Sequence, residues 1–314
     1  MPSRYDPLFE PISIRHVRLK NRIVVPPMRT NRDIVGDDGL AWYQNLAKGG
    51  AGLIIVEAVG VERFGSSIAA EELARLAEVV HEQDVPIVMQ LFAASFGCGS
   101  ASDLSIDEVQ SNVRLFGHAA TVCRQAGFDG VEPHGAHGFM LNQFFSPSEN
   151  RRTDRYGGAL QNRMRLGLDI VREVRQRTGP DFLIFYRHTP RQEAGYGMDE
   201  SVVFAQRLVE TGIDVMDISP ASEKAPADLA APFKRALSVP VIGVNGMDDP
   251  DCAVEALVQA RCDLVGIGRG LIADAHWPNK VREGRLEEIV RCVKCNEKCY
   301  GNLDKGIPIA CAQW

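Results

Sequence analysis

Four cysteines near the C-terminal end have the residue type and spacing to bind a metal centre. They follow the pattern C-x2-C-x3-C-x11-C, at Cys292, Cys295, Cys299 and Cys311. Thiolates brought together by short loops can complete a tetrahedral zinc site or hold one [4Fe-4S] cluster, and the spacing alone leaves both alternatives open. We expect residues 286–314 to form a short metal-binding extension of a larger domain at 1–285.

Polar side chains also stand at the ends of short apolar runs. Arg29, Gln90, His134 and Arg187 each end or follow such a run, and His137 comes three residues after His134. In isolation, two histidines at this spacing are more often a structural pair or part of a metal site, and an arginine is more often in a surface ion pair. If the runs are strands of an α/β barrel, however, their ends meet around one active site.

Two glycine-containing loops strengthen that interpretation. Asn245 and Gly246 follow one apolar run, and Gly268, Arg269 and Gly270 follow the next. Glycine lets backbone N–H groups approach a phosphate closely, and Arg269 adds positive charge. The last two strand ends of a (β/α)8 barrel often bind phosphate, so we expect a phosphate group there.

The elements that must position these residues are eight short β-rich runs separated by amphipathic helical stretches. This order predicts a (β/α)8 TIM barrel, with a doubly wound open sheet as the alternative fold. Residues 12–22 are expected to form a hairpin across the N-terminal end of the barrel, and helices are expected at 67–83, 105–127 and 162–179. The strand runs are 23–27, 52–58, 86–91, 128–133, 182–187, 214–219, 239–244 and 263–268.

Composition limits the class of protein. The chain has 314 residues, 45% hydrophobic and 24% charged, as expected for a globular protein. Its net charge of -6, without a basic block, argues against nucleic acid or an anionic membrane as a partner. The N-terminal segment lacks the apolar core of a signal peptide, and no apolar run could span a bilayer. We expect one large cytoplasmic domain.

Four segments carry a family resemblance: LFEPISIRHVRLKNRIVVPPM, AKGGAGLIIVEA, AGFDGVEPHGAHGFMLNQFFSPSENRRTDRYGG and DLVGIGRGLIADAHWPNKV. They are similar to segments of the old yellow enzyme family of FMN-dependent oxidoreductases. The four-cysteine run narrows the resemblance to the iron–sulfur branch, which contains 2,4-dienoyl-CoA reductase and trimethylamine dehydrogenase. The resemblance implies FMN beside a [4Fe-4S] cluster. Arg29 stands where trimethylamine dehydrogenase has the cysteine that binds its flavin covalently, so we expect the FMN to be bound noncovalently. Larger members continue into dinucleotide-binding domains, and we expect this chain to lack its own NAD(P)H-oxidising module.

The resemblance also implies roles for individual residues. Gln90 would hydrogen bond the flavin pyrimidine, Arg187 would stabilise the negative charge of the reduced ring, and Arg29 would raise the flavin potential. His134 and His137 would donate hydrogen bonds to an electron-withdrawing group of the substrate. Residues lining the ring would be Pro27, Met28 and Ala58, and residues holding the phosphate would be Asn245, Gly246, Gly268 and Arg269.

The sequence departs from the family pattern around the substrate. Phe139 occupies the position of the usual proton-donating tyrosine, and phenylalanine cannot donate a proton. Glu223 is the predicted substitute acid, with a solvated surface glutamate as the alternative. The segment after Gln90 is also shorter than in the family, which predicts a more open mouth or one completed by another chain.

Three functions remain open at this point. The leading one is reduction of an activated C=C bond by hydride transfer from the flavin, with the cluster exchanging electrons with a carrier protein or second subunit. The runner-up is substrate oxidation, such as desaturation or amine dehydrogenation, with electrons leaving through the cluster. The third is a non-catalytic electron-relay subunit. NAD(P)H is a further candidate reductant.

Overall fold

The computed structural model describes residues 3–97, 99–221 and 228–314. Eight parallel strands close a barrel in the order β10-β3-β4-β5-β6-β7-β8-β9, which confirms the predicted (β/α)8 fold and excludes the open sheet. Each strand lies within two or three residues of a predicted run. The strands are β3 (Ile23–Val25), β4 (Leu53–Gly60), β5 (Ile87–Phe92), β6 (Gly130–Gly135), β7 (Leu183–His188), β8 (Val215–Ile218), β9 (Val241–Val244) and β10 (Leu264–Gly266).

The predicted hairpin is also confirmed. Strands β1 (Ile12–Ile14) and β2 (Val17–Leu19) pair antiparallel. Ile14, Val17 and Leu19 pack into one cluster with inward-facing strand residues such as Val24 and Phe185. The hairpin therefore contributes to the apolar filling of the barrel interior.

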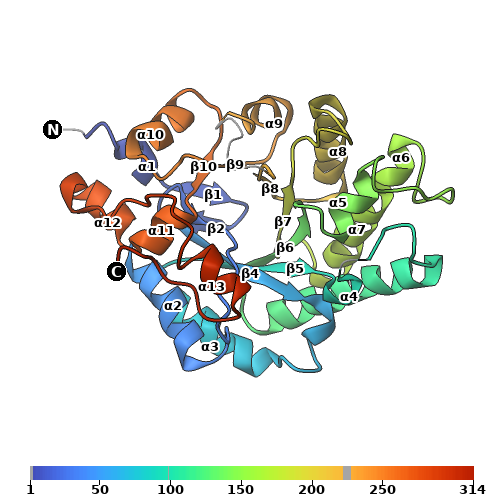
Figure 1. Cartoon of the computed structure of the whole chain (residues 1–314), viewed down its shortest axis with the longest axis horizontal. Helices are drawn as coiled ribbons and strands as arrows, with labels where there is room; N and C mark the ends of the chain where they lie inside the picture. The colour runs from blue at the N-terminus through green and yellow to red at the C-terminus, as the bar shows by residue number, and fades with distance from the viewer. Residues whose placement is uncertain (1–2, 98, 222–227) are drawn as a thin grey trace.

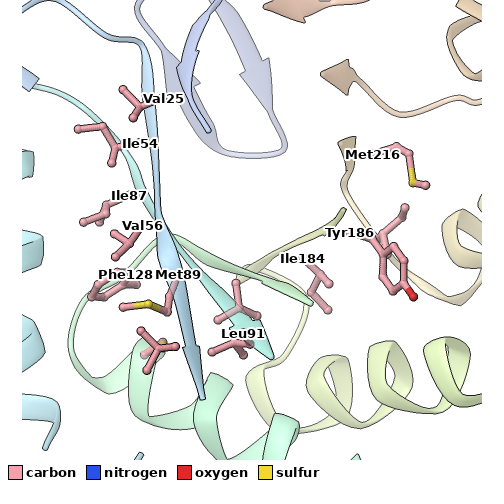
Figure 2. Close-up of a cluster of buried hydrophobic side chains, with 14 of the residues drawn as sticks. Val25, Ile54, Val56, Ile87, Met89, Leu91, Phe128, Ile184, Tyr186 and Met216 are labelled. Carbon is pink, nitrogen blue, oxygen red and sulfur yellow. The ribbon is translucent and has the colours of Figure 1, made fainter. Parts of the chain in front are cut away.

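Helices surround the barrel (Figure 1). Between them and the strands lies a second apolar cluster, part of which is drawn in Figure 2, where Val25, Ile54, Val56, Ile87 and Met89 come from β3, β4 and β5. The helices are α1 (Asp6–Phe9), α2 (Asp37–Lys48), α3 (Ala70–His81), α4 (Ile106–Gln125), α5 (Met140–Phe145), α6 (Leu160–Arg163), α7 (Arg165–Thr178), α8 (Met198–Thr211), α9 (Ala231–Ala236), α10 (Pro250–Val258), α11 (Arg269–Ala273), α12 (Trp277–Arg282) and α13 (Tyr300–Asp304), with short 3-10 turns at Val61–Arg63, Ala94–Phe96 and Leu286–Glu288.

Local sequence signals account for several helix ends. Ser105 caps α4 by accepting a hydrogen bond from the backbone of Glu108, whose side chain bonds back to Ser105. Gly179 ends α7 with φ 77°. The helix predicted at 162–179 is shorter, because Met164 separates α6 from α7. None of the helices in the described residues combines the length and apolar character that crossing a bilayer requires.

The alternation of side chains along the strands creates a polar zone above the apolar interior. Val88, Phe185 and Val215 face inward in the apolar cluster, so residues two positions later face inward as well. On β5, β6, β7 and β8 these positions pair in register, Gln90 with Glu132 and Arg187 with Asp217. We call Gln90, Glu132, Arg187 and Asp217 the polar layer.

The C-terminal segment, residues 290–314, packs on the barrel beside α2 (Figure 1) and against the loop that follows β3. The backbone N–H of Ile309 donates to Thr30 O at 3.0 Å, and Asn31 Nδ2 donates to Ile307 O at 3.2 Å. Trp314 packs near Trp42, with ring centroids 6.4 Å apart. We call residues 290–314 the cysteine segment.

Candidate active site at the barrel mouth

The polar layer is buried and hydrogen bonded. On β5 and β6, Gln90 Nε2 donates to Glu132 Oε1 at 2.8 Å. On β7 and β8, Arg187 donates from Nη1 to Asp217 Oδ2, and from Nη2 to Ser219 Oγ at 2.9 Å. The Arg187 and Asp217 side chains are 8% and 0% exposed, so this ion pair is almost completely removed from water. The strand register thus places a fixed positive charge where the strands end.

Both predicted histidines lie beside Arg187. His134 is on β6, and His137 follows in the loop with φ 58°. Their ring centroids are 5.3 Å apart, with the rings edge to face. His137 Nε2 hydrogen bonds to Ser219 Oγ at 2.9 Å, and Ser219 in turn accepts from Arg187. The sequence prediction that these three residues form one site agrees with this geometry.

The environment keeps the two imidazoles neutral at neutral pH. Burial lowers the pKa of His134 well below its ordinary value, and the charges of His137 and Arg187 lower it further. Desolvation of the ring and then Arg187 also lower the pKa of His137, although that residue is exposed overall. His134 Nδ1 is buried and has no hydrogen-bond partner among the described residues. The hydrogen-bonding capacity of that nitrogen is therefore unused within the described part of the chain.

Phe139 lies at the rim of the same site. Its ring centroid is 4.7 Å from that of His134 and 5.6 Å from that of Phe92, and the residue is 40% exposed. The position that carries the usual tyrosine in the family therefore faces His134, with an apolar ring in place of an acid. Glu223, the predicted substitute acid, lies outside the described residues.

Another part of the candidate site is formed by the segment after β3 and by residues on β4. Glu57 is buried, and its carboxylate accepts a hydrogen bond from the backbone N–H of Thr30. Burial raises the pKa of Glu57, against the opposing effects of the Thr30 hydrogen bond and the Arg29 charge. The predicted residues of this group are Pro27, Met28 and Ala58, which are half-buried, and Arg29, which is exposed.

The two predicted phosphate loops follow β9 and β10, which pair with each other, and β10 also pairs with β3. After β9, Asn245 and Gly246 have left-handed backbones, with φ 82° and 75°. Glycine adopts this conformation readily and asparagine tolerates it. After β10, a Cβ added to Gly268 would lie 3.5 Å from Met28 Sδ. The phosphate loop and the predicted ring-lining segment are therefore immediate neighbours.

The four predicted metal ligands surround one hollow in the cysteine segment. Cys292, Cys295, Cys299 and Cys311 all line it, together with Arg269. Arg269 Nη1 donates to Asn296 Oδ1 at 2.8 Å, so this arginine connects the loop after β10 to the cysteine segment. Its predicted contact with a phosphate stays a prediction.

Sequence reasoning missed three residues of the site. Glu132, Asp217 and Ser219 complete the hydrogen-bonded set, yet only their neighbours were singled out. A signal was present: Glu132 on β6 and Asp217 on β8 are polar residues at inward strand positions, and Ser219 comes two residues after Asp217.

FMN, the cofactor implied by the resemblance, fits these residues. The site offers a buried cation at Arg187, a buried ring nitrogen without a partner at His134 and an apolar lining at Met28. It also offers two adjacent loops, at Gly246 and Gly268, with little side-chain bulk. Together these features match a ligand with a flat polar ring at one end and a phosphate at the other.

Comparisons with known proteins agree with this geometry. A family model described as "NADH:flavin oxidoreductase / NADH oxidase family" matches residues 7–103 and 77–288. An NADH oxidase of Thermoanaerobacter brockii is 33% identical over 354 residues, which cover 95% of this chain and 54% of that protein. A cinnamate reductase of Clostridium sporogenes is 29% identical over 386 residues, covering 99% and 58%.

A solved structure of 2-naphthoyl-CoA reductase has the same fold, with a TM-score of 0.89 at 24% identity, over 99% of this chain and 57% of that one. The chain thus spans about half the length of these two relatives. Because the family model covers most of the chain and one relative is 33% identical over nearly all of it, the chain belongs to the NADH:flavin oxidoreductase / NADH oxidase family, that is, the old yellow enzyme family of FMN-dependent oxidoreductases.

Proposed function

We propose that the chain reduces an activated C=C bond at FMN, with the electron-withdrawing group of the substrate bound by His134 and His137. The main supporting observation is that His134 Nδ1 is buried and has no partner among the described residues. It lies beside the hydrogen-bonded set Arg187, Ser219 and His137. FMN supplies hydride transfer when it is bound. One relative is named for the reduction of cinnamate, an α,β-unsaturated carboxylate, which supports this substrate class.

The protein groups would act by position and charge. Neutral imidazoles can donate N–H hydrogen bonds to a carbonyl or carboxylate oxygen, which draws electrons away from the β-carbon and favours hydride addition there. Arg187 would stabilise negative charge on the flavin side of the site, and Gln90 would orient the ring through its amide. Phe139 cannot supply the α-carbon proton, so Glu223 or solvent would supply it.

The remaining cofactor contacts are those that the family resemblance implies. Pro27, Met28 and Ala58 would line the ring, and Arg29 would add charge at its edge. Asn245, Gly246, Gly268 and Arg269 would hold the phosphate.

We further propose that the cysteine segment binds a [4Fe-4S] cluster rather than zinc. All four cysteines line one hollow. Four such thiolates could complete a zinc site or each bond a different iron of a cluster, and the resemblance to the iron–sulfur branch of the family favours the cluster.

Such a cluster would exchange single electrons with an external carrier protein or second subunit. Exposed apolar side chains near the cysteines, Val293 and Tyr300 among them, offer a docking surface of the kind that protein partners cover. NAD(P)H at the barrel mouth is the alternative electron source.

The first experiment combines composition with turnover. Anaerobically purified protein should contain FMN with about four irons and four sulfides per chain, and it should reduce enones or cinnamate-type acids with a reduced carrier. His134→Ala should abolish most of that turnover, whereas Ser201→Ala, on the outer side of the barrel, is the matched control. Turnover only with amines and an artificial acceptor would favour the oxidative function. Bound FMN without any turnover would favour an electron-relay subunit.

A further inference from the structure

We propose that Glu132 and Asp217 share one proton, with Glu132 as the neutral partner, and that this carboxyl pair positions Gln90 and Arg187 for the flavin. The inference rests on the proposed function in one respect only, which is that the ligand bound beside Gln90 and Arg187 is a flavin. The sequence analysis assigned no role to either carboxyl, and each lies beside a residue predicted to contact FMN, Glu132 beside Gln90 and Asp217 beside Arg187. They would be positioning residues, acting through Gln90 and Arg187.

The geometry leaves one oxygen on each carboxyl to be explained. Glu132 Oε1 accepts from Gln90, and Asp217 Oδ2 accepts from Arg187. Glu132 Oε2 and Asp217 Oδ1 are buried and have no donor among the described residues. Both residues are 0% exposed, so water cannot supply the missing donors from bulk solvent. Two unsatisfied acceptors in one buried site are costly, and a single proton between them satisfies both.

The electrostatics agree with this reading of the geometry. Burial raises the pKa of Glu132 well above its ordinary value, and the neighbouring charge of Asp217 raises it further. For Asp217, burial also raises the pKa, but Arg187 and a hydrogen bond from Glu132 oppose that effect. The carboxyl beside the guanidinium is therefore the better place for the negative charge, and Glu132 is the better place for the proton.

This arrangement has two consequences for the cofactor site. A neutral Glu132 still accepts from Gln90 Nε2, which fixes the orientation of the amide and leaves its second N–H for a ligand. The ionised Asp217 balances Arg187, so the layer carries one negative and one positive charge. A second carboxylate there would give the layer a net negative charge, which disfavours an electron-rich reduced ring.

Paired isosteric variants test the proposal. Glu132→Ala should weaken FMN binding about tenfold, the scale of one lost buried hydrogen bond. Glu132→Gln should restore it, because a glutamine amide can donate to Asp217 and accept from Gln90 as a protonated glutamate does. The flavin midpoint potential should rise in Asp217→Asn, which removes a charge, and stay near the wild-type value in Glu132→Gln. Equal rises in both variants would overturn the proposal, since both carboxyls would then be ionised.

A second readout does not depend on flavin. Infrared spectra of the flavin-free protein should contain the carbonyl stretch of a buried protonated carboxyl, and Glu132→Gln should remove it. Absence of that band in the folded wild-type protein would also overturn the proposal. If the wild-type chain binds no FMN, the proposed function fails, but the infrared comparison still decides the shared proton. Ser201→Ala, at a buried hydroxyl outside the barrel interior, is the control for general destabilisation, and it should alter neither the potential nor the band.

Discussion

The polar layer and the cysteine segment are the two chemically rich regions of the molecule, and they are built differently. The polar layer is held by the register of four parallel strands and by hydrogen bonds among buried side chains. The cysteine segment has no strand, and the loop that carries its first three cysteines includes Lys294 and Asn296 with left-handed φ of 57° and 61°. Cys295 is exposed, as is Val293 at 60%. A site on barrel strands is thus organised before its cofactor binds, whereas a site on loops depends more on its metal.

The largest expected effect comes from removing the cation of the polar layer. Arg187→Met should lower the free energy of unfolding by about 3–5 kcal/mol, because Asp217 is left as an unpaired buried charge. Urea unfolding of the flavin-free protein at neutral pH measures it. If the polar layer were as loosely built as the cysteine segment, the loss would stay below about 1 kcal/mol.

The matched control is the double variant Arg187→Met with Asp217→Leu. Replacing both partners of a buried ion pair with apolar residues removes the unpaired charge, so most of the lost stability should return. FMN binding should not return with it, since the predicted ring contact of Arg187 is absent. Recovery of both properties together would contradict a cofactor role for Arg187.

The second prediction concerns His188, a histidine that is buried but does not belong to the candidate active site. His188 is on the outer side of β7, fully buried, with Nε2 2.9 Å from Ser201 Oγ, and burial lowers its pKa to about 3. Since the folded pKa is below the ordinary value near 6.5, the unfolded chain binds the proton first as the pH falls. This contribution to stability is full above about pH 6.5 and is lost progressively toward pH 3.

Between pH 6.5 and pH 5, the free energy of unfolding should therefore fall by about 2 kcal/mol less in His188→Phe than in the wild-type protein. Phenylalanine suits the site, which is surrounded by the rings of Phe145, Phe204 and Phe233. Urea unfolding at the two pH values gives the comparison. Ser201→Ala is the control, expected to lower stability at both pH values by a similar amount, and an unchanged slope in His188→Phe would refute the assignment.

A smaller effect on global stability, but a large local one, is expected from removing a cysteine. Cys299→Ser should abolish cluster binding while changing the unfolding of the barrel by less than about 1 kcal/mol, because the residue lies outside the apolar clusters. Limited trypsin digestion should then cut at Lys294 or Lys298, which are exposed, and leave the barrel intact. Cys252→Ser, at an exposed cysteine on α10, is the control. Equal resistance of all three proteins would mean that the segment needs no metal for its structure.

The same difference explains what could be predicted from the sequence. The strands, the hairpin and the barrel followed from apolar periodicity, because each strand must bury side chains on both faces. Gln90, His134 and Arg187 followed from their position at strand ends. The pairing of Glu132 with Asp217 did not, since it depends on strand register and on which oxygens remain without donors. The contact between Arg269 and Asn296 is likewise a long-range packing result that spacing does not encode.

The smallest expected effect on stability is at the rim, where Phe139 is 40% exposed. Phe139→Tyr should change the free energy of unfolding by no more than about 0.5 kcal/mol. It adds a hydroxyl donor beside His134, so enone turnover should rise about tenfold or more if proton delivery to the α-carbon limits the reaction. Phe92→Tyr adds the same group to the neighbouring ring, 5.6 Å away, and controls for polarity alone. A folded, FMN-loaded Phe139→Tyr protein with unchanged enone turnover would show that another group already supplies the proton.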